Sequence, residues 1–212
     1  PVTLAVLLLC WNASAQTALA QEASGNTTTL STVTVTGQAA KDAPTELTDS
    51  YTAAGTTVGS KLPTSLKETP QSISVITRQR IEDQNLSTLD EIMAQTPGVT
   101  VDLSGTAVIP SYYSRGYPVD YFQYDGVPIQ TGGASWSQPD MIMFDHVEML
   151  RGAAGLFNGA GQPGGVINLV RKRPAGKQQF SGSLGLGSWN TRRGEVDYST
   201  PLNQSGSVRA RL

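Results

Sequence analysis

The sequence predicts a β-rich fold, in which a small mixed α+β domain with short helices is followed by long antiparallel strands. Glycine (22 residues) and proline (12 residues) are spread over the 212-residue chain, and charged residues make up only 15% of it. This composition is typical of short strands joined by turns. Two short helix signatures occur before residue 100, and after Pro174 apolar and polar residues alternate over long runs.

The first 20 residues predict a secretory signal peptide. An apolar run over residues 2–10 is too short to cross a bilayer as a helix, and the small residues after it end in Ala18-Leu19-Ala20, an A-x-A cleavage site. The chain begins at Pro1 without a basic segment, so we expect the signal to be truncated. The alternative is that the run is a buried strand or helix.

Residues 21–62 are expected to form a flexible tail. They are rich in Thr, Ser, Gly and Ala, and they cannot bury enough apolar surface to offset the entropy lost on ordering. Within the tail, Thr32-Val33-Thr34-Val35-Thr36 is an isolated β-prone patch. Such a patch can add as a strand to the open sheet edge of another protein, or it can be a Thr/Val-rich linker.

The mixed domain is predicted over residues 63–174. Residues 72–76 alternate like a half-buried strand, after which Thr77 can cap a helix that runs through Glu82. Residues 88–91 fit a capping box, and Pro97-Gly98 ends the second helix, whose apolar face is formed by Leu89, Ile92 and Met93. Further strands are predicted at 99–101, 112–115, 122–124, 147–150 and 166–170, with an Asp125-Gly126 turn.

Residues 175–212 are predicted to be antiparallel strands with one apolar and one polar face. Phe180, Leu184 and Leu186 alternate with small residues, and the last residues alternate between apolar side chains and arginines. This pattern is expected where lipid lies outside a barrel and water inside, but also at the solvated edge of a soluble sheet. The chain ends at Leu212 within a strand, so we expect truncation at this end too.

Composition argues against nucleic-acid binding and against most catalytic sites. The net charge is −2 and the pI is near 5.4, so there is no basic excess. His146 and Cys10 are the only residues of their kinds, which excludes most metal sites and any catalytic triad without His146. We interpret His146 as a structural histidine, and the acidic pairs 82–83 and 90–91 as facing solvent.

Residues 159–164 match G-x-G-x-x-G, the pattern of dinucleotide-binding sites. That pattern requires a helix to receive the pyrophosphate, whereas Gly165 is followed by a predicted strand and by no acidic ribose partner. An enzymatic function would need NAD or FAD binding, so we do not expect one. We interpret these glycines as positions of close packing or positive φ.

Six segments carry a specific resemblance. They are KETPQSISVIT (67–77), TPGV (96–99), SRGY (114–117), YDGVP (124–128), VEMLRG (147–152) and GGVINLVRKRP (164–174). Together they closely resemble the plug domain of TonB-dependent ferric-siderophore receptors of the Gram-negative outer membrane. The nearest likeness is to receptors for ferric pyoverdine and ferric coprogen, judging from residues 111–116 and 185–189.

The resemblance implies an α+β plug with a small mixed four-stranded sheet, seated in a β-barrel of about 22 strands. Residues 175–212 hold only its first strands. The resemblance places the TonB box near residues 32–37, in a periplasmic tail that binds TonB, which ExbB–ExbD energise. Such a receptor imports an iron(III)–siderophore chelate without covalent chemistry, a cofactor or a resident metal. Only residues 21–31 precede the box, too few for a signalling domain.

The resemblance also implies site residues. The arginines of the R-G and L-R-G motifs, Arg115 and Arg151, face carboxylates of the barrel wall, so both partners should be missing in this chain. Ligand contacts come from plug loops at about 104–111 and 130–139. Ile109 and Trp136 stand where pyoverdine receptors place an arginine and a tyrosine, which favours a less anionic ligand that packs on Trp136.

Four more residues are candidates for hydrogen bonds to the ligand: Tyr112, Tyr113, Tyr117 and Gln138. Tyr112 and Tyr113 can instead only pack the plug. Two alternative functions stay open: a TonB-dependent receptor for another nutrient, such as haem, cobalamin or an oligosaccharide, and a free-standing soluble binding module.

Overall fold

The structure of the 212-residue chain is a computed structural model that describes residues 44–60, 62–103, 110–129, 138–153 and 163–212. The chain divides into two units, 1–37 and 38–212, and all described residues belong to the second. Several predicted features lie outside the described residues: the signal peptide, the patch Thr32–Thr36, Gly159 and Gly161 of the glycine motif, and most of the two ligand loops, with Ile109 and Trp136.

A five-stranded mixed sheet forms the centre of the fold, in the order β3-β9-β10-β7-β8. Its strands are β3 (Ser72–Ile76), β9 (Phe144–Arg151), β10 (Gly165–Arg171), β7 (Tyr121–Tyr124) and β8 (Val127–Ile129). β10 and β7 are parallel, and the other neighbours are antiparallel.

The expected four strands are corrected to five because β8 folds back onto β7. The turn between them needs two residues with positive φ, and Asp125 (φ 50°) and Gly126 (φ 78°) supply them. Asp125 and Gly126 were predicted as a turn, but the three residues after it were not recognised as a strand.

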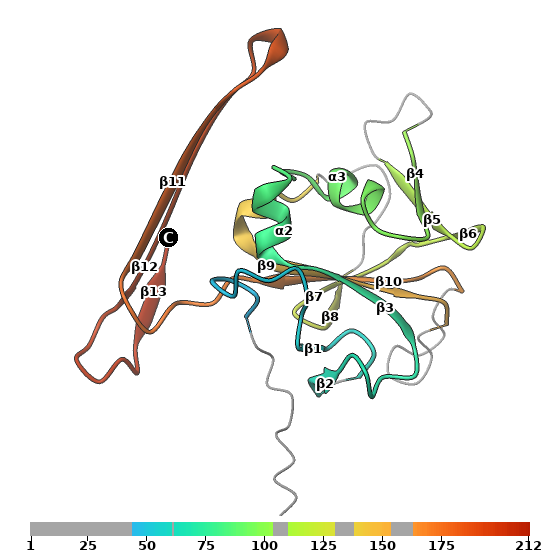
Figure 1. Ribbon diagram of the computed structural model, residues 1–212, viewed down its shortest axis with the longest axis horizontal. Helices are drawn as coiled ribbons and strands as arrows, with labels where there is room; N and C mark the ends of the chain where they lie inside the picture. Colours follow the sequence, from blue (N-terminus) through green and yellow to red (C-terminus); the bar gives the residue numbers. More distant parts are fainter. Residues whose placement is uncertain (1–43, 61, 104–109, 130–137, 154–162) are drawn as a thin grey trace, which may run out of the picture. The chain divides into compact units, whose positions relative to one another are not determined.

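Helices α2 (Arg78–Asp83) and α3 (Leu89–Ala94) cover one face of this sheet (Figure 1). The Thr77 side chain accepts a hydrogen bond from the Arg80 N–H, and the Glu91 carboxylate accepts one from the Thr88 N–H at 3.0 Å. Both predicted caps are therefore present. The main apolar cluster lies between helices and sheet and includes Ile81, Leu89, Ile92, Met93, Val147, Met149, Ile167 and Leu169.

Residues 45–58, which we call the N-terminal strap, contact α2 through Ser50 and Tyr51 and continue to the opposite face of the sheet. The strap contains β1 (Gly55–Thr56), which pairs with β2 (Thr64–Ser65), and both lie below the sheet in Figure 1. Val58 is 2% exposed and packs with Leu150 and Val166. The expectation of a flexible tail up to residue 62 is thus wrong for residues 44–60, because carboxylates on β9 bind the backbone of the strap.

A separate three-stranded sheet is formed by β4 (Val99–Asp102), β5 (Ser111–Ser114) and β6 (Tyr117–Pro118). β5 and β6 are joined by Arg115 (φ 53°) and Gly116 (φ 83°), again a pair with positive φ. A 3-10 helix, η2 (Met141–Met143), leads directly into β9.

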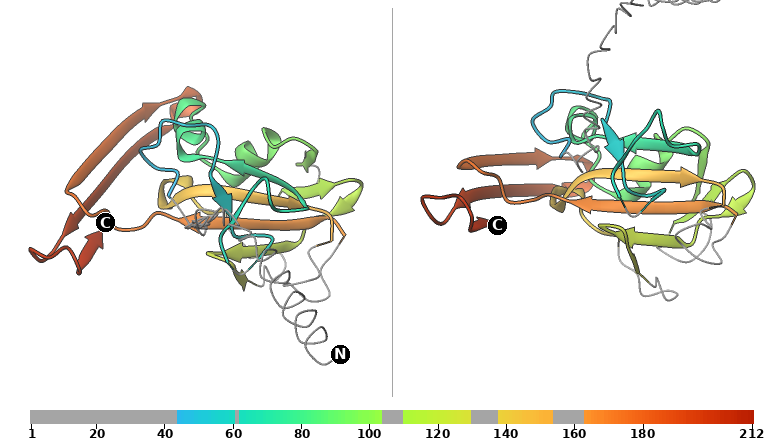
Figure 2. Two further views of the ribbon diagram at one scale, coloured as in Figure 1. Left: turned by 60° about the horizontal axis from the view of Figure 1, so that its bottom comes forward. Right: turned by 90° about the horizontal axis from the view of Figure 1, so that it is seen from below.

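The last strands form a third sheet, β11 (Gln179–Leu186), β12 (Arg192–Pro201) and β13 (Arg209–Arg211), with η3 (Ser188–Asn190) at the hairpin turn. Figure 2 shows β11 and β12 running side by side. The alternation is as predicted: Phe180, Leu184, Leu186 and Val196 are 64–93% exposed on one face, and Ser183, Arg193, Glu195 and Asp197 lie on the other. No helix among the described residues is long and apolar enough to cross a membrane.

Gly164 and Gly165 are packing glycines. A Cβ at Gly164 would lie 2.0 Å from the Pro118 carbonyl oxygen, and one at Gly165, whose φ is 129°, would lie 2.0 Å from the Leu150 carbonyl oxygen. A strand follows them, not a helix. For Gly164 and Gly165 both observations agree with the interpretation as positions of close packing, while Gly159 and Gly161 lie outside the described residues.

Candidate functional site

Two arginines lie close to each other at one end of the fold. Arg115 is exposed, and its Nη1 would lie 3.3 Å from a Cβ at Gly152, the residue after Arg151. Arg151 donates from Nη1 to the Pro97 carbonyl oxygen at 2.5 Å, while its buried Nε has no hydrogen-bond partner. Among the described residues, no carboxylate lies within 4.0 Å of either guanidinium. Their assignment to barrel carboxylates stays a prediction.

Tyr112 and Gln138, two of the predicted ligand residues, are bonded to each other. Gln138 donates from Nε2 to the Tyr112 hydroxyl at 3.2 Å and accepts the Asp90 N–H at 3.2 Å. The Tyr112 ring is 3% exposed and meets Phe122 edge-on at 6.1 Å. Burial raises the pKa of the Tyr112 hydroxyl far above its usual value. This geometry favours the packing role that the sequence left open for Tyr112.

The other predicted ligand residues are placed differently. Tyr113 alternates with Tyr112 on β5 and is half-buried, and Tyr117 is 53% exposed on β6. Both are accessible to a ligand, but the structure brings neither to Gln138. Their ligand role stays a prediction, as does that of Ile109 and Trp136.

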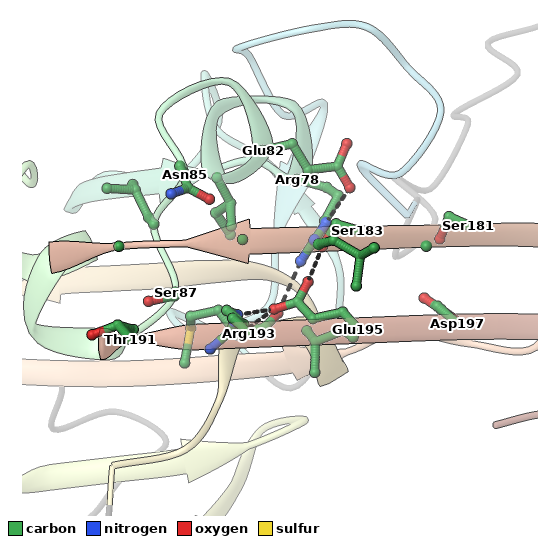
Figure 3. A pocket seen from close by; sticks show the side chains of 18 of the residues that line it. Arg78, Glu82, Asn85, Ser87, Ser181, Ser183, Thr191, Arg193, Glu195 and Asp197 are labelled. Atoms are coloured by element: carbon green, nitrogen blue, oxygen red, sulfur yellow. Dashed lines mark hydrogen bonds and ion pairs between the residues drawn. The ribbon is translucent and has the colours of Figure 1, made fainter. Parts of the chain in front are cut away.

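A cleft of about 520 Å³ lies between α2, with the loop that follows it, and strands β11 and β12. Figure 3 shows Arg78 and Glu82 of α2 on one side and Ser183, Arg193 and Glu195 of the two strands on the other. Arg78 pairs with Glu82 at 2.6 Å, and Ser183 donates to Glu195 at 3.1 Å. The cleft is therefore lined by paired charges and hydroxyls together with apolar side chains such as Ile81, Leu86 and Met141.

One ion pair bridges this cleft. Arg193 of β12 binds the Asp140 carboxylate at 2.6 Å and also contacts Glu195. Asp140 precedes η2, whose Ile142 N–H it accepts at 2.9 Å. Burial raises the pKa of the Asp140 carboxyl, but the hydrogen bonds from Ile142 and Arg193 outweigh it, so the pKa lies below its usual value.

A second group of charges, which we call the charge junction, joins three parts of the chain. It consists of Glu46 in the strap, Lys172 after β10, and Asp197 and Arg211 on β12 and β13. Arg211 binds both carboxylates at 2.6 Å, and Lys172 binds Asp197 at 2.6 Å. These four side chains are only 5–19% exposed. The junction has no local sequence signal, because its members are far apart along the chain.

A third charged group lies wholly within the sheet. Asp145, His146 and Glu148 on β9 are 2%, 3% and 0% exposed. His146 Nδ1 lies 2.5 Å from Asp145 Oδ2, and its Nε2 lies 3.5 Å from Glu148 Oε1. This confirms a structural histidine, hydrogen-bonded to Asp145 and paired at longer range with Glu148. Three charged residues in an otherwise apolar strand were the signal by which the sequence could have revealed the group.

A β-bulge explains why the side chains of the neighbouring residues Asp145 and His146 contact each other. His146 pairs with Val170 and Phe144 with Arg171, so Asp145 has no partner on β10. Burial lowers the pKa of His146, but the hydrogen bonds and charges of Asp145 and Glu148 raise it to about 9. Among the described residues, no set of three His, Cys, Asp or Glu side chains is arranged to hold a metal ion.

Comparisons with known proteins agree with this architecture. Residues 65–166 match the TonB-dependent Receptor Plug Domain family. The chain is 45% identical over 174 residues to the ferric-pyoverdine M114 receptor PbuA of Pseudomonas sp. (strain M114), which is 80% of this chain and 21% of that receptor. The chain therefore spans about a fifth of the length of the relatives that it matches.

Solved structures give the same result. The outer-membrane ferripyoverdine receptor of Pseudomonas aeruginosa, bound to ferripyoverdine, superimposes with a TM-score of 0.74 at 43% identity, covering 79% of this chain and 23% of the receptor. The alcaligin outer-membrane receptor FauA of Bordetella pertussis gives 0.71 at 39% identity, covering 79% and 30%. The chain is thus similar to TonB-dependent siderophore receptors over about four-fifths of its length, and its residues 65–166 match the plug domain of TonB-dependent receptors.

Proposed function

We propose that the protein to which this chain belongs binds ferric siderophores at the cell surface and imports them across the outer membrane with energy from TonB. The observation that carries the proposal is the extent of the likeness to ferric-pyoverdine receptors: more than 40% identity over about four-fifths of the chain, in sequence and in structure.

The two faces of β11 and β12 support a place in a barrel wall. The exposed row of Phe180, Leu184 and Leu186 suits contact with lipid, and the polar face lies against the plug through Arg193 and Asp140. In a free-standing soluble module this apolar row would be exposed to water, which is unfavourable. Thr32–Thr36 serves as the TonB box and adds as a strand to TonB in the periplasm.

The ligand of the proposed receptor is an iron(III)–siderophore chelate of the pyoverdine or hydroxamate type, which packs on Trp136. Arg115 and Arg151 lock the plug to carboxylates of the barrel. The unpartnered buried Nε of Arg151 supports this assignment, because a buried charged donor needs an acceptor.

The test is equilibrium binding to the intact protein in detergent, followed by quenching of tryptophan fluorescence. The ligands are ferripyoverdine, ferrioxamine B, ferric coprogen, haem and cyanocobalamin. We expect saturable quenching by at least one ferric siderophore and weaker binding to Trp136→Phe, whereas Trp189→Phe, the matched control at the 99% exposed hairpin tip, binds normally. Saturation by haem or cyanocobalamin alone would contradict the proposal.

A further inference from the structure

The strap is attached to the main sheet by side chains, not by strand pairing. Within the described residues, its strand β1 pairs only with β2. The Asp145 carboxylate accepts the N–H groups of Thr45 and Glu46, each at 2.8 Å. The Glu148 carboxylate accepts the N–H of Thr57 at 2.9 Å. Charge-assisted hydrogen bonds thus fix both ends of the strap to β9.

His146 holds these two carboxylates. An unpaired buried carboxylate is strongly destabilising, and as an imidazolium His146 donates toward both of them. Asn168 of β10 adds a neutral donor, with Nδ2 at 2.8 Å from Glu148. Burial raises the pKa of both carboxyls, but the hydrogen bonds from His146 and from the strap or Asn168 outweigh it, so both pKa values lie below normal.

Charged side chains from the neighbouring elements are engaged elsewhere. The Arg78 guanidinium binds Glu82 and the carbonyls of Met141 and Phe144. Lys172 binds Asp197, and the Glu46 carboxylate binds Arg211. Within the described residues, His146 is therefore the cation that balances Asp145 and Glu148.

We propose that Asp145, His146 and Glu148 form a clasp that holds the strap on β9, and that the strap detaches as a unit while the five-stranded sheet stays folded. The sheet is stabilised by the apolar cluster under α2 and α3, to which the strap contributes no residue. The buried apolar residue of the strap is Val58, against Leu150 and Val166. His146 is the positioning residue. Without its charge the two carboxylates lack a counter-ion, and detachment of the strap lets water solvate them.

The clasp does not depend on what the protein binds. A role of the clasp in transport does rest on the proposed function, because the strap connects the proposed TonB box to the sheet. A force that TonB exerts on the tail acts on Thr45 before it acts on any strand of the five-stranded sheet. The hydrogen bonds of the clasp are therefore the first contacts to the sheet that resist this force.

The test is amide hydrogen exchange of the intact protein in detergent, read as protection factors for peptides of the strap and of β9–β10 separately. Wild type is compared from pH 7 to 10 with His146→Gln. The matched control is Asp125→Asn, which removes a carboxylate paired with Arg171 outside the clasp. In wild type at pH 7 we expect protection of Thr45, Glu46 and Thr57.

In His146→Gln we expect strap protection at pH 7 to fall by about 10- to 100-fold, with β9–β10 protected as in wild type. Wild-type strap protection is expected to fall as His146 loses its proton near pH 9. This pH series on the wild type tests the clasp even if the variant does not fold. Unchanged strap protection, or loss of strap and sheet protection together, would overturn the clasp. If no siderophore is imported, the proposed function fails and the clasp result still stands.

Discussion

Arg211 and Glu46 are 165 residues apart in the sequence, and their guanidinium and carboxylate groups lie 2.6 Å apart. This contact fastens the third strand of the last sheet to the first turn of the strap. Asp197 and Lys172 complete the charge junction, so the strap, the segment after β10 and the last sheet share one group of mostly buried charges.

Glu46→Gln and Arg211→Gln are expected to lower the stability of the intact protein by about 1–2 kcal/mol each, with the larger effect for Arg211→Gln because it leaves Lys172 as the one cation beside both Glu46 and Asp197 in the junction. Thermal unfolding temperatures are compared for wild type, the two single variants and the double variant in a double-mutant cycle. Arg192→Gln, in the same sheet but exposed, is the control. Additive effects of the two substitutions would show that the pair is not coupled.

The stability of the protein is expected to decrease at alkaline pH. The pKa of His146 is raised to about 9, above its unfolded value near 6.5, so its contribution is fully present below pH 6.5 and lost as pH rises through 9. The loss is on the order of 3 kcal/mol. Unfolding temperatures from pH 6 to pH 10 should decline more steeply in wild type than in His146→Gln. Parallel curves for the two proteins are the contrary result.

Gly164→Ala and Gly165→Ala are each expected to destabilise the plug by about 3 kcal/mol or more, because a Cβ at either position would lie 2.0 Å from a backbone oxygen. Gly194→Ala is the matched control, since its Cβ would meet only the flexible Leu184 side chain at 3.5 Å. Yield and unfolding temperature of the intact protein measure the effect. Equal values for all three variants would contradict this packing role.

Arg115→Ala and Arg151→Ala are expected to loosen the plug in the complete receptor, since each removes a cation assigned to the barrel wall. Limited proteolysis of outer membranes should cleave the plug faster in both variants. Arg171→Ala serves as the control because Arg171 is 65% exposed and already paired with Asp125. Unchanged protease resistance of both variants would exclude the lock.

Local signals in the sequence predicted much of the fold. Thr77 and Thr88 marked the two helix starts, Asp125-Gly126 marked a turn, and alternation marked β11 and β12. These features depend on residues that are near one another along the chain, where capping and periodicity operate.

Contacts between distant residues could not be predicted in the same way. The composition of the strap indicated disorder, because its order comes from Asp145 and Glu148, about 100 and 91 residues further on. Tyr112 and Gln138 were candidates for hydrogen bonds to a ligand, with packing left open for Tyr112, and the fold bonds them to each other across 26 residues. In both cases tertiary partners decide the outcome, and a single sequence does not identify them.

Iron uptake tests the central claim most directly. Cells that lack their own siderophore receptors and express the intact protein are given ⁵⁵Fe-labelled ferripyoverdine or ferrioxamine B. The account predicts uptake that is abolished by deletion of TonB and by Thr34→Pro, which blocks strand addition, but not by Thr28→Pro outside the box. Uptake that persists without TonB, or no uptake of any ferric siderophore by protein present in the outer membrane, would contradict it.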